Sequence, residues 1–206
     1  MIVLALVVAV LVTYRFSMHQ VPVLALTPAV QPGLPKLITL PPFALTERSG
    51  KTTTNRDLAG KIWVADFVYT TCPGPCPILT GNMAKLQDLV THDPQVMLVS
   101  FSVDPVTDTP PVLAKYADVY HADPNRWWFL TGSEKQMVDI IFNGFHVEIQ
   151  DNSGKPPEPG QFKVTHSTNF ALVDGDGIVR AFYNGTDDAD RDKLLHDIQE
   201  LEKESR

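Results

Sequence analysis

Two cysteines are the residues of this sequence whose spacing points most directly to chemistry. Cys72 and Cys76 are separated by Pro-Gly-Pro, a tripeptide that favours a tight, exposed loop between a strand and a helix start. At a helix N-terminus the positive end of the dipole favours the thiolate. Residues four apart on a helix rise ~6 Å, so both sulfurs can bind one ion or form a disulfide. Inert packing cysteines are the alternative.

Two soft thiolates select copper(I) or zinc over magnesium or calcium. Structural zinc wants four protein ligands, whereas three-coordinate copper(I) needs one further donor. Among six histidines, His166 differs from the rest because it follows the polar Pro/Gly loop Asp151–Gln161, expected to be mobile, and precedes an expected strand. A histidine satisfied locally at a strand end is the alternative. The others are His19 in a Pro-rich segment, His92, His121 and His196 on helix faces, and His146 at a helix end.

The hydrophobic pattern predicts the elements that position these residues. Strands alternate with helices early in the chain and become antiparallel late, which predicts an α/β sandwich with a mixed sheet. The expected strands are Phe43–Thr46, Lys51–Thr54, Lys61–Thr70, Val96–Val103, Trp127–Leu130, Phe170–Asp174 and Ile178–Tyr183. The expected helices are Pro77–His92, Pro111–His121, Ser133–Phe145 (capped by Ser133) and a closing helix with Leu194, Leu195, Ile198 and Leu201 on one stripe.

The N-terminal 14 residues are uncharged and apolar, and as a helix they span about 21 Å, less than the ~30 Å bilayer core. We interpret residues 1–14 as a membrane anchor, with an uncleaved or atypical signal peptide as the alternative. Six prolines between Pro22 and Pro42 disfavour helix and central strand. We therefore expect a semi-stiff linker over residues 15–42 and a globular domain over residues 43–206.

Composition excludes several classes of protein. Apolar residues make up 44% and charged residues 20%, as in ordinary globular chains. The net charge is −7 and no Lys/Arg block occurs, so no nucleic-acid partner is expected. Two cysteines are too few for a disulfide-rich scaffold or a four-cysteine zinc site.

Four segments together resemble the SCO/SenC family of copper-binding, thioredoxin-like proteins. They occur in the family's order across roughly residues 43–200: Asp66–Pro77 (DFVYTTCPGPCP), Ser102–Pro110 (SVDPVTDTP), Trp128–Gly132 (WFLTG) and His166–Gly177 (HSTNFALVDGDG). The resemblance implies a thioredoxin-like fold: a mixed central sheet flanked by helices, an N-terminal β-hairpin and an inserted hairpin or loop.

The same resemblance implies one copper ion bound by Cys72, Cys76 and His166, with Asp104 near the site beside the ligands or facing a partner. The alternative for Asp104 is a turn former before Pro105. The implied function is a copper chaperone that helps assemble the copper centre of cytochrome c oxidase subunit II. The implied location is the cytoplasmic membrane, with the domain on the periplasmic or extracytoplasmic side.

Two other functions compete for the same cysteines. A thiol-disulfide oxidoreductase would use Cys72 and Cys76 as a redox-active disulfide on subunit II or another extracytoplasmic protein, but has no need of His166. A peroxidase ranks third. Peroxiredoxin-like proteins usually carry a proline and a threonine ahead of the attacking cysteine, and no proline occurs between Gly60 and Cys72.

Overall fold

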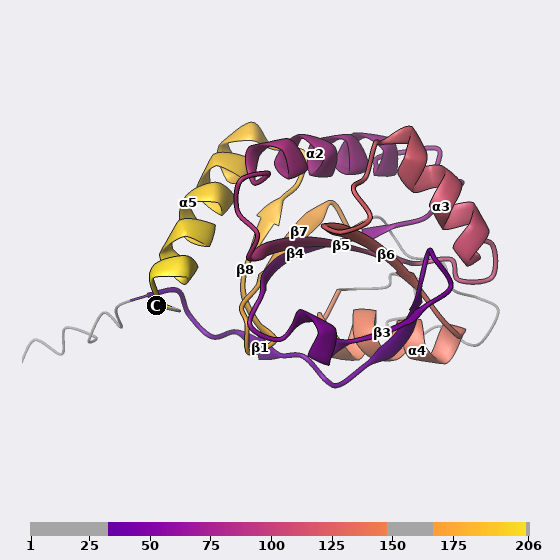
Figure 1. The fold of residues 1–206 in the computed structure, drawn as a ribbon, viewed down its shortest axis with the longest axis horizontal. Coiled ribbons are helices and arrows are strands. Elements are labelled where there is room, and N and C mark those ends of the chain that lie inside the picture. Colours follow the sequence, from indigo (N-terminus) through magenta and orange to yellow (C-terminus); the bar gives the residue numbers. More distant parts are fainter. Residues whose placement is uncertain (1–32, 148–166, 205–206) are drawn as a thin grey trace, which may run out of the picture. The chain divides into compact units, whose positions relative to one another are not determined.

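The computed structural model describes residues 33–147 and 167–204. Those residues form one curled, mixed sheet with the strand order β1-β8-β7-β4-β5-β6-β2-β3 (Figure 1). Its strands are β1 (Ile38–Thr39), β2 (Ala44–Glu47), β3 (Thr52–Thr54), β4 (Ile62–Val68), β5 (Val96–Ser102), β6 (Trp127–Thr131), β7 (Asn169–Val173) and β8 (Ile178–Asn184). Strands β4, β5 and β6 are parallel, and the other pairs are antiparallel.

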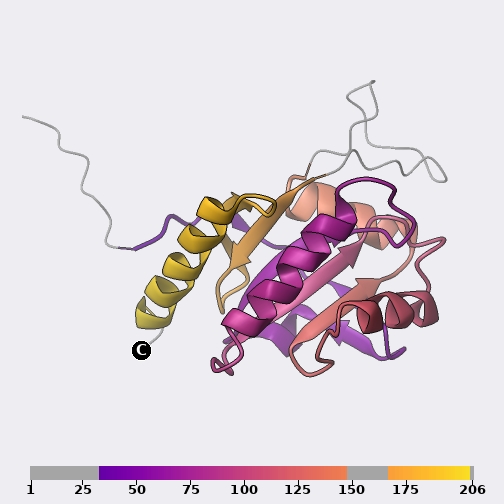
Figure 2. The same cartoon turned by 90° about the horizontal axis from the view of Figure 1, so that it is seen from above.

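Helices cover both faces of the sheet. Helices α2 (Cys76–Leu89), α3 (Pro110–Val119) and α5 (Asp188–Glu204) lie on one face, as Figure 2 shows from above. The short helix α4 (Glu134–Val138) and the π-helix η2 (Asp139–Gly144) lie on the other, and the 3₁₀ turn η1 (Asn55–Leu58) follows β3. The predicted mixed sheet flanked by helices and the N-terminal β2–β3 hairpin are confirmed.

Strand β4 lies inside the sheet, so all seven of its residues are buried. Because successive side chains point to opposite faces, Val64 and Val68 pack under α2, α3 and α5, whereas Trp63 and Phe67 pack in the second core with residues of α4 and η2. Asp66 belongs by this alternation to the first face. Strand β4 ends at Val68, and this end fixes where the cysteine loop begins.

The chain is tied to the domain before the first predicted strand. Ile38 and Thr39 form β1, which pairs with β8 at the edge of the sheet, and Leu40 is buried. An edge position explains why a strand forms in a Pro-rich stretch, since proline is tolerated there. Residues 1–32, which contain the predicted anchor, lie outside the described residues.

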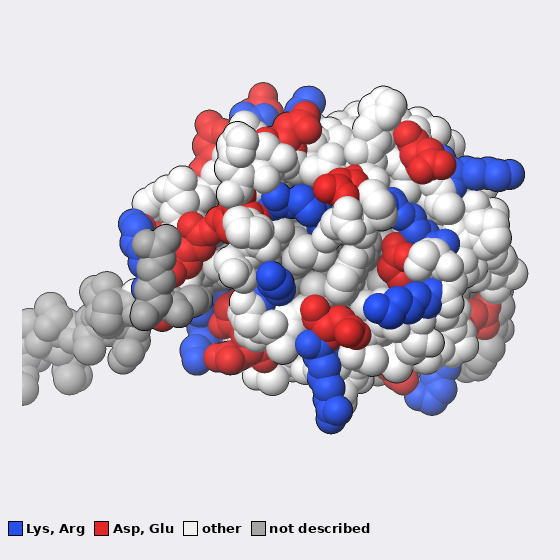
Figure 3. Space-filling view, in the orientation of Figure 1, with Lys and Arg blue, Asp and Glu red and all other residues white. Residues whose placement is uncertain are grey.

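Two features bear on the surface and on membranes. Within residues 33–147 and 167–204, no helix has the length and apolar character needed to cross a bilayer. Figure 3 shows acidic and basic side chains interspersed over the visible face of the molecule.

Candidate functional site

The cysteine loop joins the carboxyl end of β4 to the start of α2. The Cys72 N–H donates to the Tyr69 carbonyl at 3.2 Å, which turns the chain, and Cys76 is the first residue of the helix. Proline in the first turn of α2 is tolerated because N–H groups there have no intrahelical acceptor. The predicted loop and helix start are therefore confirmed, although the helix ends at Leu89 rather than His92.

The two sulfurs are less exposed than the loop around them. Pro73 and Gly74 are exposed, but Cys72 and Cys76 are only 8% and 5% exposed. Both cysteines are free thiols, and the Cys76 thiol donates a hydrogen bond to the Cys72 sulfur. The sequence thus predicted the exposed loop but not that its turn carries both thiols inward.

The environments of the two thiols differ in their effect on ionisation. Burial acts to raise the pKa of Cys72, but hydrogen bonds to its sulfur outweigh burial and lower the pKa. The donors are the Cys76 thiol, the main-chain N–H groups of Cys76 and Gly74, and the Tyr69 hydroxyl. Burial raises the pKa of Cys76 to about 12, helped by the hydrogen bond it donates to Cys72. Cys72 is therefore the sulfur that more readily becomes a thiolate.

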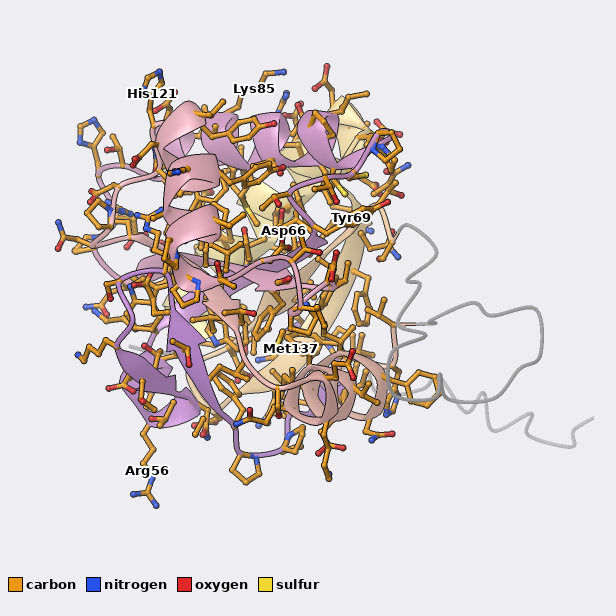
Figure 4. All side chains as sticks on the ribbon, turned by 90° about the vertical axis from the view of Figure 1, so that its right-hand side faces the viewer. Arg56, Asp66, Tyr69, Lys85, His121 and Met137 are labelled. Carbon is orange, nitrogen blue, oxygen red and sulfur yellow. The ribbon has the colours of Figure 1, made fainter. Side chains whose placement is uncertain are left out.

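Tyr69 follows β4 directly and contacts both cysteines. Its ring is partly buried against the second core, and its hydroxyl donates to the Cys72 sulfur. Burial, followed by that hydrogen bond, raises the pKa of Tyr69 to about 12. Its main-chain N–H donates to the Cys76 sulfur. Figure 4 labels Tyr69 and Asp66.

Asp108 joins the cysteine loop to the segment after β5. Its fully buried carboxylate accepts from the Thr70 hydroxyl at 2.6 Å and the Thr70 N–H at 3.2 Å. Its second oxygen accepts from the Ser102 hydroxyl at 2.7 Å. Burial raises the pKa of Asp108, partly offset by these hydrogen bonds. The carboxylate thereby holds the chain two residues before Cys72.

Asp104 lies in the same segment and is half-buried. Its carboxylate accepts from the Thr107 N–H at 3.2 Å, and its own N–H donates to the Ser102 hydroxyl at 3.1 Å. The turn-forming role considered from the sequence is therefore present. The negative charge of Asp104 also contributes to raising the pKa of Tyr69.

Asp66 was named from the sequence only as the first residue of the segment Asp66–Pro77, yet it is an unusual buried acid. It is fully buried in β4, and neither carboxylate oxygen makes a regular hydrogen bond. Burial raises the pKa of Asp66 to about 7, with a partial offset from the Ser100 hydroxyl opposite on β5. Its charge acts on Cys76 and so bears on the site. An acid inside an otherwise apolar strand was the available signal.

The histidines are placed only in part. His92, His121, His146 and His196 are exposed, whereas His19, His166 and the loop Asp151–Gln161 lie outside the described residues. In the ranges 33–147 and 167–204, no three metal-ligating side chains of the His, Cys, Asp or Glu type come together. Of the predicted site residues, the described part of the chain brings together the two cysteines.

A family model described as SCO1/SenC matches residues 33–203. The chain belongs to the SCO1/SenC family. The match begins where the described residues begin, ten residues before the predicted domain start at Phe43.

Solved structures similar to this SCO1/SenC protein agree in fold. A SCO1/SenC family lipoprotein from Bacillus anthracis is 34% identical with TM-score 0.69, over 80% of this chain and 95% of that one. BsSco, from a family of cytochrome c oxidase assembly proteins and carrying a disulfide switch, is 31% identical with TM-score 0.69, over 82% and 97%. Arabidopsis thaliana ScoI, solved with copper bound, is 26% identical with TM-score 0.63, over 78% and 98%. The predicted thioredoxin-like fold is confirmed.

Proposed function

We propose that this protein is a copper chaperone that binds one copper ion through Cys72, Cys76 and His166. It would deliver the ion to the copper centre of cytochrome c oxidase subunit II. The observation that carries the proposal is the hydrogen-bonded pair of free thiols at the start of α2. It is supported by a family in which ScoI is solved with copper and BsSco belongs to the oxidase assembly proteins.

The chemistry of the donors fits copper(I). Two sulfurs close enough to share a hydrogen bond can ligate one ion, and soft thiolates favour copper(I). Their low exposure keeps water and competing oxygen ligands away from the ion. Ion binding needs both thiols deprotonated, so the more acidic Cys72 would ligate first and Cys76 would lose its proton as the charge arrives.

The third ligand is argued from the sheet register. Strands β4 and β7 are antiparallel, with Trp63 opposite Val173 and Ala65 opposite Ala171. Extending this register by four further pairs beyond Ala65 and Ala171 sets residue 167 level with Tyr69. Ser167 is the first described residue after the gap, so the chain re-enters the described structure at the edge of the sheet that carries the cysteine loop. This supports His166 as the nitrogen donor.

A copper titration of the full chain in detergent tests the proposal. We expect one equivalent of copper(I) to bind tightly against a competing chelator. Cys72→Ser and Cys76→Ser should abolish tight binding, and His166→Ala should weaken it at least tenfold. His196→Ala, at an exposed position on α5, is the matched control and should bind as the unmodified chain does. Equal affinity in the His166→Ala chain would remove His166 from the ligand set.

A thiol-disulfide oxidoreductase is the second candidate, favoured by the free thiol pair and by the disulfide switch of BsSco. Such an activity would reduce the disulfide of a copper-site protein while Cys72 and Cys76 become oxidised. Reduction of that substrate by the His166→Ala chain at an unchanged rate, together with no copper binding by the unmodified chain, would favour this candidate.

The proposed location is the extracytoplasmic face of the cytoplasmic membrane. Residues 1–14 would provide the anchor and the following Pro-rich residues the spacer. The lipoprotein from Bacillus anthracis supports a tethered domain. Fractionation of cells that express the full chain tests this, and recovery in the soluble fraction would contradict it.

A further inference from the structure

The Asp108 carboxylate is bound to two segments of the chain through its separate oxygens. Its Oδ1 accepts from the Thr70 hydroxyl at 2.6 Å and from the Thr70 N–H at 3.2 Å. Its Oδ2 accepts from the Ser102 hydroxyl at 2.7 Å. Thr70 belongs to the cysteine loop, whereas Ser102 is the last residue of β5. The carboxylate therefore joins the cysteine loop to the end of β5.

This contact begins where the pairing of β4 with β5 ends. Val68, the last residue of β4, lies opposite Ser102, and the Val103 N–H donates to the Val68 carbonyl at 2.9 Å. Two residues further on, the Thr70 N–H has the Asp108 carboxylate as its acceptor instead of a carbonyl of β5. The side chain of Asp108 thus holds the chain for two residues beyond the strand.

Asp108 is itself held in place from several sides. Its side chain is fully buried, and its N–H donates to the Asp104 carbonyl at 2.8 Å, which closes a turn. The Ser102 hydroxyl that donates to its carboxylate also accepts from the Asp104 N–H at 3.1 Å. A buried polar network whose members all have partners is rigid. The acceptor of Thr70 is therefore fixed relative to the sheet.

The outer part of the cysteine loop has little packing to hold it. Thr71, Pro73 and Gly74 are exposed, whereas the side chains of Cys72 and Cys76 are buried. A loop that is already ordered loses less conformational entropy when an ion joins its two sulfurs. A contact that fixes the start of the loop should therefore strengthen ion binding without touching the ion.

We propose that Asp108 is a positioning residue for the thiol pair. Through Thr70 it holds the cysteine loop in the conformation that binds the ion, and it touches neither the ion nor the sulfurs. The proposal rests on the proposed use of Cys72 and Cys76 as ligands. The order of the loop is measured on the metal-free chain, so the positioning role and the proposed function can fail separately.

Thr70→Val tests the proposal, because valine keeps the shape of threonine and removes the hydroxyl donor. Asp108→Ala is less suitable, since it also deprives Ser102 of its acceptor. In the full, metal-free chain in detergent, we expect hydrogen exchange to become about tenfold faster at the N–H groups of residues 70–74, as for one lost hydrogen bond to a charged group. Strands β4 and β5 should keep their protection, and the dissociation constant for copper(I) should rise about tenfold.

Two controls separate the contact from a general loss of stability. Thr70→Ser retains the hydroxyl and should restore the exchange rates and the copper(I) affinity of the unmodified chain. Tyr183→Phe removes another hydroxyl that donates at 2.6 Å to a buried carboxylate, that of Asp197 on α5. It should leave the exchange of residues 70–74 and the copper(I) affinity unchanged.

Unchanged exchange of residues 70–74 in Thr70→Val would overturn the proposal, as would an equal acceleration in Tyr183→Phe. Loss of protection throughout β4 and β5 in Thr70→Val would also overturn it, because the contact would then support the fold rather than the loop. Faster exchange with an unchanged copper(I) affinity would refute the link to ion binding. No copper(I) binding by the unmodified chain would refute the proposed function alone, since exchange still decides whether Asp108 positions the loop.

Discussion

The Thr70 hydroxyl donates a hydrogen bond of 2.6 Å to the buried Asp108 carboxylate. This contact ties the cysteine loop to the segment that follows β5, and the same carboxylate accepts from Ser102. The position of Cys72 therefore depends on a carboxylate 36 residues further along the chain.

Asp108→Ala should lower the free energy of unfolding by roughly 3 kcal/mol, because buried donors on Thr70 and Ser102 lose a charged acceptor. Urea unfolding followed by circular dichroism measures this. Asp88→Ala, at an exposed position on α2, is the matched control and should change stability by less than about 0.5 kcal/mol. A loss no larger than that of the control would show that the network contributes little.

Asp66 should make the fold less stable as the pH rises. Its folded pKa is about 7 against an ordinary 3.8, so the folded state holds more protons than the unfolded state between those values. The free energy of unfolding should then fall between about pH 4 and pH 7. Asp66→Asn should remove most of that decrease in the free energy of unfolding. The decrease amounts to a few kcal/mol at ~1.4 kcal/mol per pKa unit.

Urea unfolding at several pH values measures the slope. Asp108, whose pKa burial also raises, contributes in the same direction in both proteins, so the comparison isolates Asp66. Asp88→Asn should keep the slope of the unmodified chain. An unchanged slope in Asp66→Asn would mean that folding does not raise the pKa of Asp66.

Arg180 fastens the N-terminal segment to the domain. It is 4% exposed and donates to the Pro35 carbonyl at 3.0 Å, to the Leu34 carbonyl, to Asp174 at 3.0 Å and to Glu204 at 2.9 Å. Arg180→Met should destabilise the fold by about 3–5 kcal/mol, because it leaves buried acceptors without a partner. It should also speed proteolysis near residue 35.

Limited proteolysis with mass analysis of the fragments checks the second effect. Arg191→Met is the control, since Arg191 pairs with the exposed Asp188, and such pairs contribute little. Equal cleavage near residue 35 in both variants would show that Arg180 does not hold this segment.

Cys72 should react with iodoacetamide faster than Cys76. The pKa of Cys72 is lowered, whereas that of Cys76 is raised to about 12, and the thiolate is the reacting form. Brief labelling of the reduced chain at pH 7.5, followed by fragmentation of the peptide that contains both residues, gives the ratio. We expect Cys72 to carry at least ten times more label. Equal labelling would contradict the asymmetry.

The sequence predicted the elements well where the hydrophobic pattern is strong. The predicted bounds of strand β4 and helix α2 lie within a few residues of the observed ones, because burial on both faces and helical periodicity leave clear signals. Strand β1 was missed, since a two-residue edge strand among prolines has no pattern of its own. The predicted helix Ser133–Phe145 is α4 followed by the π-helix η2, a change of hydrogen bonding without a clear sequence signature.

The site was predicted less completely than the fold. The spacing of Cys72 and Cys76 indicated a working pair, but not that both thiols turn inward. Asp104 was singled out, whereas Asp108 holds the loops together, because hydrogen bonds between distant segments depend on tertiary structure. Asp66 owes its raised pKa to burial within β4, which its residue type alone does not reveal.

X-ray absorption of the full chain loaded with one equivalent of copper(I) tests the central claim most directly. The account predicts two sulfur ligands and one nitrogen ligand at the copper, with loss of the nitrogen alone in His166→Ala. A site with only oxygen or nitrogen ligands, or an unchanged ligand set in His166→Ala, would contradict it.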